Sequence, residues 1–225
     1  MAKTESPRDK IVSALMELAA DTPFDEISLQ EICAKAGVTL AELREYFPSK
    51  GAIIASFSRH IDQIVLKNIS SPHEDESSKD RLFDILMARL DAMKPHRAAL
   101  KNILNWAKRD PSAALALNQM AANSQRFMLE AAGISTAGPI GVLKIQGLVI
   151  TFARVMEVWF DDEGEDMGKT MAALDRALER GGKMVGRAEQ VQRLTSPLCD
   201  FIGGVLKFRE NNRKSRDDTR YTEQS

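Results

Sequence analysis

The chain has 225 residues, 44% of them apolar and 28% charged, with 31 Lys and Arg against 32 Asp and Glu. This length and apolar content favour a folded protein with its own core and exclude a disordered chain. The net charge of −1 excludes a protein that coats nucleic acid by bulk positive charge. Cys33 and Cys199 have no metal or redox spacing, and no uninterrupted apolar run reaches the roughly 18 residues of a membrane span. We therefore expect a soluble, cytoplasmic protein.

Helical periodicity begins near the amino terminus and continues through most of the chain. Apolar residues recur every three or four positions from Ile11 to Ala19, whereas alternating patterns and Asn-Gly turns, which are typical of strands, are scarce. The sequence therefore predicts an all-α protein.

Two short helices are predicted next, each with the same signal at its start. Ser28 and Thr39 are suitable N-caps, and each is followed three residues later by a glutamate, Glu31 or Glu42, which completes a capping box. Gly37 ends the first of these helices, and the sequence Phe47-Pro48 ends the second.

Longer helices are predicted after Ser49, which caps a helix with an apolar stripe up to Val65. The polar stretch 70–79 is expected to be a linker or loop. Further helices are expected over about 82–93, from near Pro95 to Trp106, over 111–132, over 139–160, and from about 167 toward Gly181. The expected domains are 1–52, 53–208 and a disordered charged tail over 209–225.

The predicted short helices and the turn Ala36-Gly37-Val38-Thr39 between them form a helix-turn-helix pattern. The glycine permits a sharp turn, so the second helix can stand at a steep angle to the first and offer its first residues to the DNA major groove. Because a glycine between two helices is common, the pattern alone is only moderately specific.

Residues 10–55 resemble the DNA-binding domain of TetR-family transcriptional regulators. The resemblance rests on the helix from Ile11 to Ala19, on the sequence SLQEICAKAGVT over 28–39, and on YFPSK over 46–50 followed by Ile53 and Ile54. It implies an N-terminal three-helix helix-turn-helix domain and a C-terminal helical domain for ligand binding and dimerisation.

What the resemblance implies for function is a homodimer that binds a palindromic operator on double-stranded DNA. The dimer would act as a repressor and release DNA when a hydrophobic small molecule enters the C-terminal domain. By position, the residues that would begin the recognition helix and approach bases are Thr39, Leu40 and Ala41. Those that would contact phosphates are Ser28, Arg44, Tyr46 and Lys50, the last together with the amino end of the following helix.

Two features depart from the family pattern. Arg44 stands where an aromatic residue is usual, although a guanidinium can also hold a phosphate or a guanine. Glu42 and Glu45 place carboxylates on the recognition helix, and residues 1–60 contain seven basic and nine acidic side chains, a net charge of 7 − 9 = −2. DNA-binding domains are usually basic over their footprint.

A second resemblance supports an alternative function. Residues 159–178 are similar to the end of TetR-like lipid-binding proteins of ubiquinone biosynthesis. A protein of this kind would be an accessory protein of isoprenoid metabolism that has lost operator binding. Residues 197–208 fit either an interfacial amphipathic helix or a segment that packs on its own domain or a partner. Contact with a membrane is expected only under this alternative.

The C-terminal half contains large, adaptable apolar side chains that suit either a ligand pocket or ordinary core packing. The pocket candidates are Phe83, Met87, Trp106, Phe127, Met128, Phe152 and Met156. Residues at helix-packing spacing in the last two predicted helices are the candidate dimer interface: Val142, Ile145, Val149, Met171, Leu174 and Leu178.

Catalytic and metal-binding signatures are missing from the sequence. The three histidines stand apart from carboxylate or cysteine partners, and no phosphate loop or nucleophile motif is present. Acidic pairs such as Asp161-Asp162 are interpreted as solvated loop residues. We therefore expect no enzyme, no metal and no cofactor.

Overall fold

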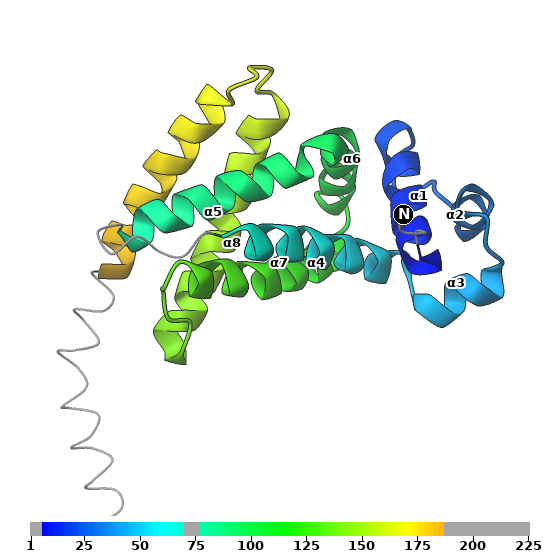
Figure 1. Cartoon of the computed structure of the whole chain (residues 1–225), viewed down its shortest axis with the longest axis horizontal. Coiled ribbons are helices and arrows are strands. Elements are labelled where there is room, and N and C mark those ends of the chain that lie inside the picture. Colours follow the sequence, from blue (N-terminus) through cyan, green and yellow to red (C-terminus); the bar gives the residue numbers. More distant parts are fainter. Residues whose placement is uncertain (1–5, 70–76, 187–225) are drawn as a thin grey trace, which may run out of the picture. The chain divides into compact units, whose positions relative to one another are not determined.

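The computed structural model describes residues 6–69 and 77–186, and throughout these ranges the chain forms helices joined by short loops, with no strand (Figure 1). The elements are α1 (Pro7–Asp21), α2 (Leu29–Ala36), α3 (Leu40–Tyr46), α4 (Lys50–Asn68), α5 (Ser78–Met93), the 3-10 turn η1 (Lys94–His96), α6 (Arg97–Ala107), α7 (Pro111–Ala131) and α8 (Gly138–Phe160). Residues 168–186 are also helical. The all-α prediction is confirmed.

The chain divides into two compact units, Met1–Gly181 and Gly182–Ser225. Of the second unit the structure describes residues 182–186, so the predicted tail over 209–225 and the segment 197–208 lie outside the described residues. All contacts discussed below belong to the first unit.

The predicted helix starts are confirmed atom by atom. The Ser28 hydroxyl accepts a hydrogen bond from the Glu31 amide at 3.2 Å, and the Glu31 carboxylate accepts one from the Ser28 amide at 2.8 Å. Thr39 and Glu42 repeat this reciprocal arrangement at the start of α3. Gly37 ends α2 in the left-handed conformation, with φ of 67°, which a residue with a side chain rarely adopts. The turn between α2 and α3 is therefore defined by local sequence.

The N-terminal helices pack around α1. The buried side chains of α1 include Ile11 and Leu15, and α2 and α3 contribute Ile32 and Leu43 to the same core. Helix α1 contacts α2, α3 and α4, and it also packs along α6 of the second half of the unit. The helix-turn-helix part of the fold is therefore held against the helices that follow it.

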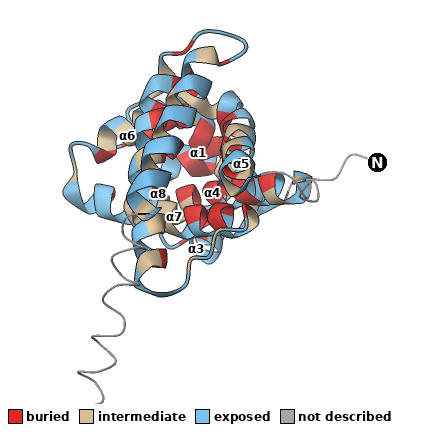
Figure 2. Ribbon diagram, turned by 90° about the vertical axis from the view of Figure 1, so that its left-hand side faces the viewer, coloured by how far each residue is buried: buried red, intermediate tan, exposed pale blue. Residues whose placement is uncertain are grey.

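Helix α4 continues through the boundary expected between residues 52 and 53. It contacts α1, α5 and α7, so a single helix joins the two halves of the unit (Figure 1). The linker expected over 70–79 ends earlier than predicted, because Ser77 caps α5 and both Ser78 and Lys79 are helical. Figure 2 shows buried residues gathered where α1, α4 and α5 face the interior.

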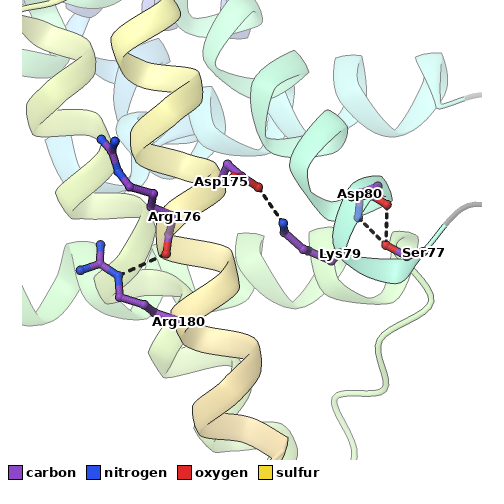
Figure 3. Close-up of polar contacts among 6 residues, drawn as sticks. All are labelled: Ser77, Lys79, Asp80, Asp175, Arg176 and Arg180. Atoms are coloured by element: carbon purple, nitrogen blue, oxygen red, sulfur yellow. Dashed lines mark hydrogen bonds and ion pairs between the residues drawn. The ribbon is translucent and has the colours of Figure 1, made fainter.

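The helix that begins at residue 168 is fixed by polar contacts at its start and on its side. The Asp162 carboxylate accepts hydrogen bonds from the amide and hydroxyl of Thr170 at 2.9 and 2.7 Å, and these bonds lower the pKa of Asp162. Asp162 is buried, so its interpretation as a solvated loop residue is wrong; Asp161 is exposed and pairs with Lys101. An ion pair of 2.7 Å between Lys79 and Asp175 joins α5 to this helix (Figure 3).

Candidate nucleic-acid interface and ligand cavity

Helix α3 presents its first turn to solvent. Thr39, Leu40 and Ala41 are exposed, Leu40 by 49% of its surface, whereas Leu43 is buried and anchors the helix to the core. Tyr46 is 36% exposed at the carboxyl end. The first turn of α3 is therefore accessible to another molecule.

The Glu42 carboxylate is used within its own helix start. It accepts hydrogen bonds from the amide and hydroxyl of Thr39 at 2.7 and 2.8 Å, and these bonds lower the pKa of Glu42. The carboxylate therefore stays ionised at neutral pH and interacts favourably with the positive end of the α3 dipole. Glu31 does the same at the start of α2, where it also accepts the hydroxyl of Ser28 at 2.6 Å.

These carboxylates determine where a phosphate can approach. The starts of α2 and α3 already hold a negative group, whereas the first turn of α4 contains no acidic residue and is capped by the Ser49 hydroxyl. Among these three helices, α4 therefore offers the amino end best suited to an anion.

Lys50 has a different environment from the one predicted for it. Its ammonium donates to the carbonyl oxygens of Phe24 at 2.8 Å and Ile27 at 2.7 Å, and it lies 4.7 Å from the centre of the Phe24 ring. Burial lowers the pKa of Lys50. The sequence pattern predicted a phosphate contact, but in this structure the side chain holds the loop between α1 and α2 against α4.

Arg44 is exposed, and its guanidinium donates to the Pro48 carbonyl at 3.1 Å. This bond uses only part of the five-donor guanidinium, so nitrogens remain that can reach a phosphate. Glu45 is exposed on the same helix.

Because Lys50 and Arg44 have different environments, we expect their replacement to affect different properties: stability for Lys50 and DNA binding for Arg44. Lys50→Met removes charge-assisted hydrogen bonds and is expected to lower the free energy of unfolding by about 1–3 kcal/mol, with the salt dependence of DNA binding unchanged. Arg44→Ala is expected to change stability by less than about 0.5 kcal/mol and to make the slope of log K against log salt shallower by about 0.9. Urea unfolding and fluorescence anisotropy measure the two quantities.

Arg59→Ala is the matched control, because Arg59 is an exposed arginine further along α4. It is expected to leave both quantities unchanged. If Lys50→Met and Arg44→Ala reduce the salt dependence of DNA binding equally, Lys50 contacts a phosphate as Arg44 does.

A cavity of about 350 Å³ lies among α4, α5, α6, α7 and α8. Its wall is mainly apolar, with Phe57 from α4, Met93 from α5, Ile103 from α6 and Met120 from α7. Of the seven predicted pocket residues, Phe152 and Met156 line it.

The other five predicted pocket residues lie elsewhere. Trp106 packs on the Phe24 ring with centroids 4.6 Å apart, and Met128 is fully buried in the core. Phe83 and Met87 are partly buried against the core, and Phe127 is 57% exposed. Helical spacing finds apolar side chains but does not distinguish those that fill the core from those that leave a space between helices.

Polar residues also line the cavity, and the search for apolar side chains missed them. They are Ser58, Arg89, Asn118 and Gln125, with Lys108 at an exposed position. Arg89 pairs with the buried Asp62, and the Ser124 hydroxyl donates to Asp62 at 2.7 Å. The sequence contained a sign of this buried pair, because each charged residue stands among apolar ones. Arg89 directly precedes Leu90 on α5, and Asp62 lies between Ile61 and Val65 on α4.

Two of the cavity's helices also contact the N-terminal helices. Asn102 of α6 donates to the carbonyl of Ala19 at the end of α1 at 2.9 Å. Helix α4, which lines the cavity through Phe57, contacts α1 directly. Movement of α4 or α6 at the cavity would therefore be transmitted to α1.

The candidate dimer residues divide into two groups. Ile145, Val149, Leu174 and Leu178 are buried within the single chain, so they are not accessible to a partner, whereas Val142 is 63% and Met171 36% exposed. Further exposed apolar residues of α8 are Leu143, Ile150 and Val158. On α8, the apolar surface available to a partner therefore consists of Val142 from the predicted seam together with Leu143, Ile150 and Val158 beside it.

Helix α8 is unusually apolar for a helix with so much exposed surface. Its mean hydropathy of 1.4 over 18 residues passes a length-and-composition test for a membrane span, with 39% of that window buried. Buried helices of soluble proteins pass the same test, and Lys144 and Arg154 interrupt the apolar run.

No cluster of three or more His, Cys, Asp or Glu side chains that could hold a metal ion is found among the residues that the structure describes.

Comparison with known proteins finds similarity to bacterial transcriptional regulators. Residues 11–57 match the family model described as "Bacterial regulatory proteins, tetR family". A TetR transcriptional regulator from Nitrosomonas europaea has a similar structure, with a TM-score of 0.62 and 24% identity, covering 79% of this chain and 98% of that one. A TetR transcriptional regulator from a Rhodococcus species gives a TM-score of 0.56 at 20% identity, covering 78% and 95% of the two chains.

The chain is also similar to proteins named nucleoid occlusion factor SlmA. The protein of this name from Shewanella oneidensis is 25% identical over 111 residues, which are 49% of this chain and 50% of that protein. The chain thus spans about half the length of the curated relatives it matches.

Proposed function

We propose that this chain is a TetR-family homodimeric transcriptional repressor released from DNA by a hydrophobic small molecule, because residues 11–57 match the family's model and form a helix-turn-helix. The observation that carries the proposal is the connection between two features of one compact unit. An exposed first turn of α3 is mounted on α1, and α1 is held by the same helices, α4 and α6, that form walls of the apolar cavity.

The proposed mechanism follows from that connection. A ligand in the cavity contacts α4 through Ile54 and Phe57 and α6 through Ile103, and so favours one arrangement of these helices over another. Because α4 leads directly from α3 and α6 is bonded to α1, the ligand changes the spacing of the two recognition helices in a dimer. Productive spacing is about one DNA turn, roughly 34–36 Å.

The dimer is proposed to form through α8 and the helix over 168–181. Exposed Leu143 and Ile150 lie seven positions apart, which is two turns along one face of α8. A face of this kind is stabilised when a second copy covers it. Cytoplasmic location and the absence of catalytic activity are part of the same proposal.

The second candidate function is the lipid-binding accessory protein. The cavity favours it, because its wall is mainly apolar and suits an isoprenoid or acyl group as well as it suits an effector. The net charge of −2 over residues 1–60 also favours it. The two candidates differ in one measurable property, since only the repressor binds a specific DNA sequence.

Selection of duplexes from a random library by the purified protein separates the two functions. The proposal predicts enrichment of an inverted repeat whose half-sites are centred about one turn apart, or a multiple of it. The double variant Leu40→Ala/Thr39→Ala is expected to abolish the enrichment while the protein remains folded. Recovery of unselected sequences by the native protein would contradict the repressor and favour the lipid-binding candidate.

A further inference from the structure

The cavity reaches solvent where the end of α6, the start of α7 and α8 meet. Of the described residues that line it, Lys108, Ala114 and Ala153 are exposed, whereas the others are buried or half-buried. Lys108 directly follows α6, Ala114 lies near the start of α7, and Ala153 lies on α8. The ammonium of Lys108 is therefore the charged group that the described residues place at the mouth of the cavity.

The charged residues of the cavity wall differ in whether their charge is compensated inside the fold. Arg89 and Lys108 are the charged residues among the described ones that line the cavity, and both are cations. Arg89 is buried and paired with Asp62, so its charge is balanced within the protein. An anion at the cavity would therefore be attracted to Lys108 at the mouth.

A ligand can reach the ammonium of Lys108. The side chain is 59% exposed, and its Nζ lies 2.9 Å from Oε1 of Glu157, whose side chain is 57% exposed. An ion pair between two exposed side chains contributes little to stability, so an anionic ligand can replace Glu157 at small cost. A lysine can also lay its methylene stem along an apolar wall while its ammonium stays in water, which suits a ligand with an apolar chain and a charged head.

We propose that the effector is an amphipathic anion, whose alkyl chain fills the cavity and whose head group pairs with Lys108 in place of Glu157. This inference rests on the proposed function, because it describes the molecule that the regulator detects. The chain lies against apolar side chains such as Phe57, Met93 and Phe152. The cavity volume of about 350 Å³ is near the lower end for small-molecule sites, so a chain of medium length fits.

Three probes with the same alkyl chain test the charge of the head group. They are octanoate, 1-octanol and octylammonium, and isothermal titration calorimetry with the full-length protein at neutral pH and low salt measures their affinities. Octanoate is expected to bind about threefold more tightly than octanol, because its carboxylate stays at the exposed mouth and pairs with Lys108. Octylammonium is expected to bind most weakly, and the preference for octanoate is expected to decrease as salt is added.

Variants at the mouth test the same contact from the protein side. Lys108→Glu reverses the charge and leaves the buried wall intact, so octylammonium is expected to bind more tightly than octanoate while octanol binds as before. Glu157→Gln removes the group that competes for Lys108, so octanoate is expected to bind more tightly than it does to the native protein. Lys101→Glu is the control, because Lys101 is an exposed lysine of α6 that pairs with Asp161 outside the cavity wall. It is expected to keep the native order of affinities.

The outcomes distinguish this inference from the proposed function. Equal affinity for octanoate and octanol, or tightest binding of octylammonium, would overturn the anionic head group and leave release by an uncharged hydrophobic ligand in place. A preference for octanoate that survives in Lys108→Glu, or an unchanged octanoate affinity in Glu157→Gln, would also overturn it. Failure of all three probes to bind would overturn both the inference and release by a hydrophobic ligand.

Discussion

Replacing Asp62 by alanine is expected to lower the free energy of unfolding by about 3–5 kcal/mol, because it leaves the Arg89 guanidinium charged and buried without its partner. The side chain of Arg89 is 6% and that of Asp62 11% exposed, so water cannot replace the lost carboxylate. Ser124 loses its acceptor as well. Urea-induced unfolding followed by circular dichroism measures the change.

Two matched variants show whether the loss of stability comes from breaking the Arg89–Asp62 pair or from removing any aspartate. Asp84→Ala changes an exposed aspartate of α5 and is expected to alter stability by less than about 0.5 kcal/mol. Asp62→Leu combined with Arg89→Met replaces the pair by apolar side chains and is expected to recover most of the loss. A loss below about 1 kcal/mol in Asp62→Ala would mean that the pair contributes little to the folded state.

The double variant Leu143→Glu/Ile150→Glu is expected to be monomeric and to lose about 10²–10⁴-fold in apparent operator affinity. Both residues are exposed in the single chain, by 53% and 48%, so the substitutions leave the fold of one subunit intact. In a dimer they would bury four carboxylates against an apolar partner face. Sedimentation equilibrium measures the mass, and anisotropy on the selected operator measures the affinity.

Leu115→Glu is the control for this prediction. Leu115 is 69% exposed on α7 and lies outside the α8 face, so the variant is expected to remain dimeric. A Leu143→Glu/Ile150→Glu protein that stays dimeric with unchanged operator affinity would place the subunit interface elsewhere.

Features determined by neighbouring residues were predictable from the sequence. The capping boxes at Ser28 and Thr39 involve partners three positions away, and the turn at Gly37 depends on a conformation that glycine adopts readily. These local signals located α2 and α3 and, with them, the family.

Features determined by distant residues were not predictable. Lys50 finds its two carbonyl partners 26 and 23 residues earlier in the chain, so its position in the motif gave no sign of these internal contacts. Arg89 and Asp62 are 27 residues apart and meet only because α4 and α5 pack together. Burial of Ile145 and Val149 within the single chain likewise depends on how α8 rotates against α7, which periodicity alone does not define.

The central claim is that the exposed start of α3 reads a DNA sequence although residues 1–60 carry a net charge of −2. Fluorescence anisotropy of the native protein with the duplex upstream of its own gene and with a shuffled duplex, at two salt concentrations, tests it most directly. We predict tighter binding to the upstream duplex and a clear loss of affinity at the higher salt concentration, because phosphate contacts release counterions. Equal affinity for both duplexes at both salt concentrations, or no binding to either, would contradict it.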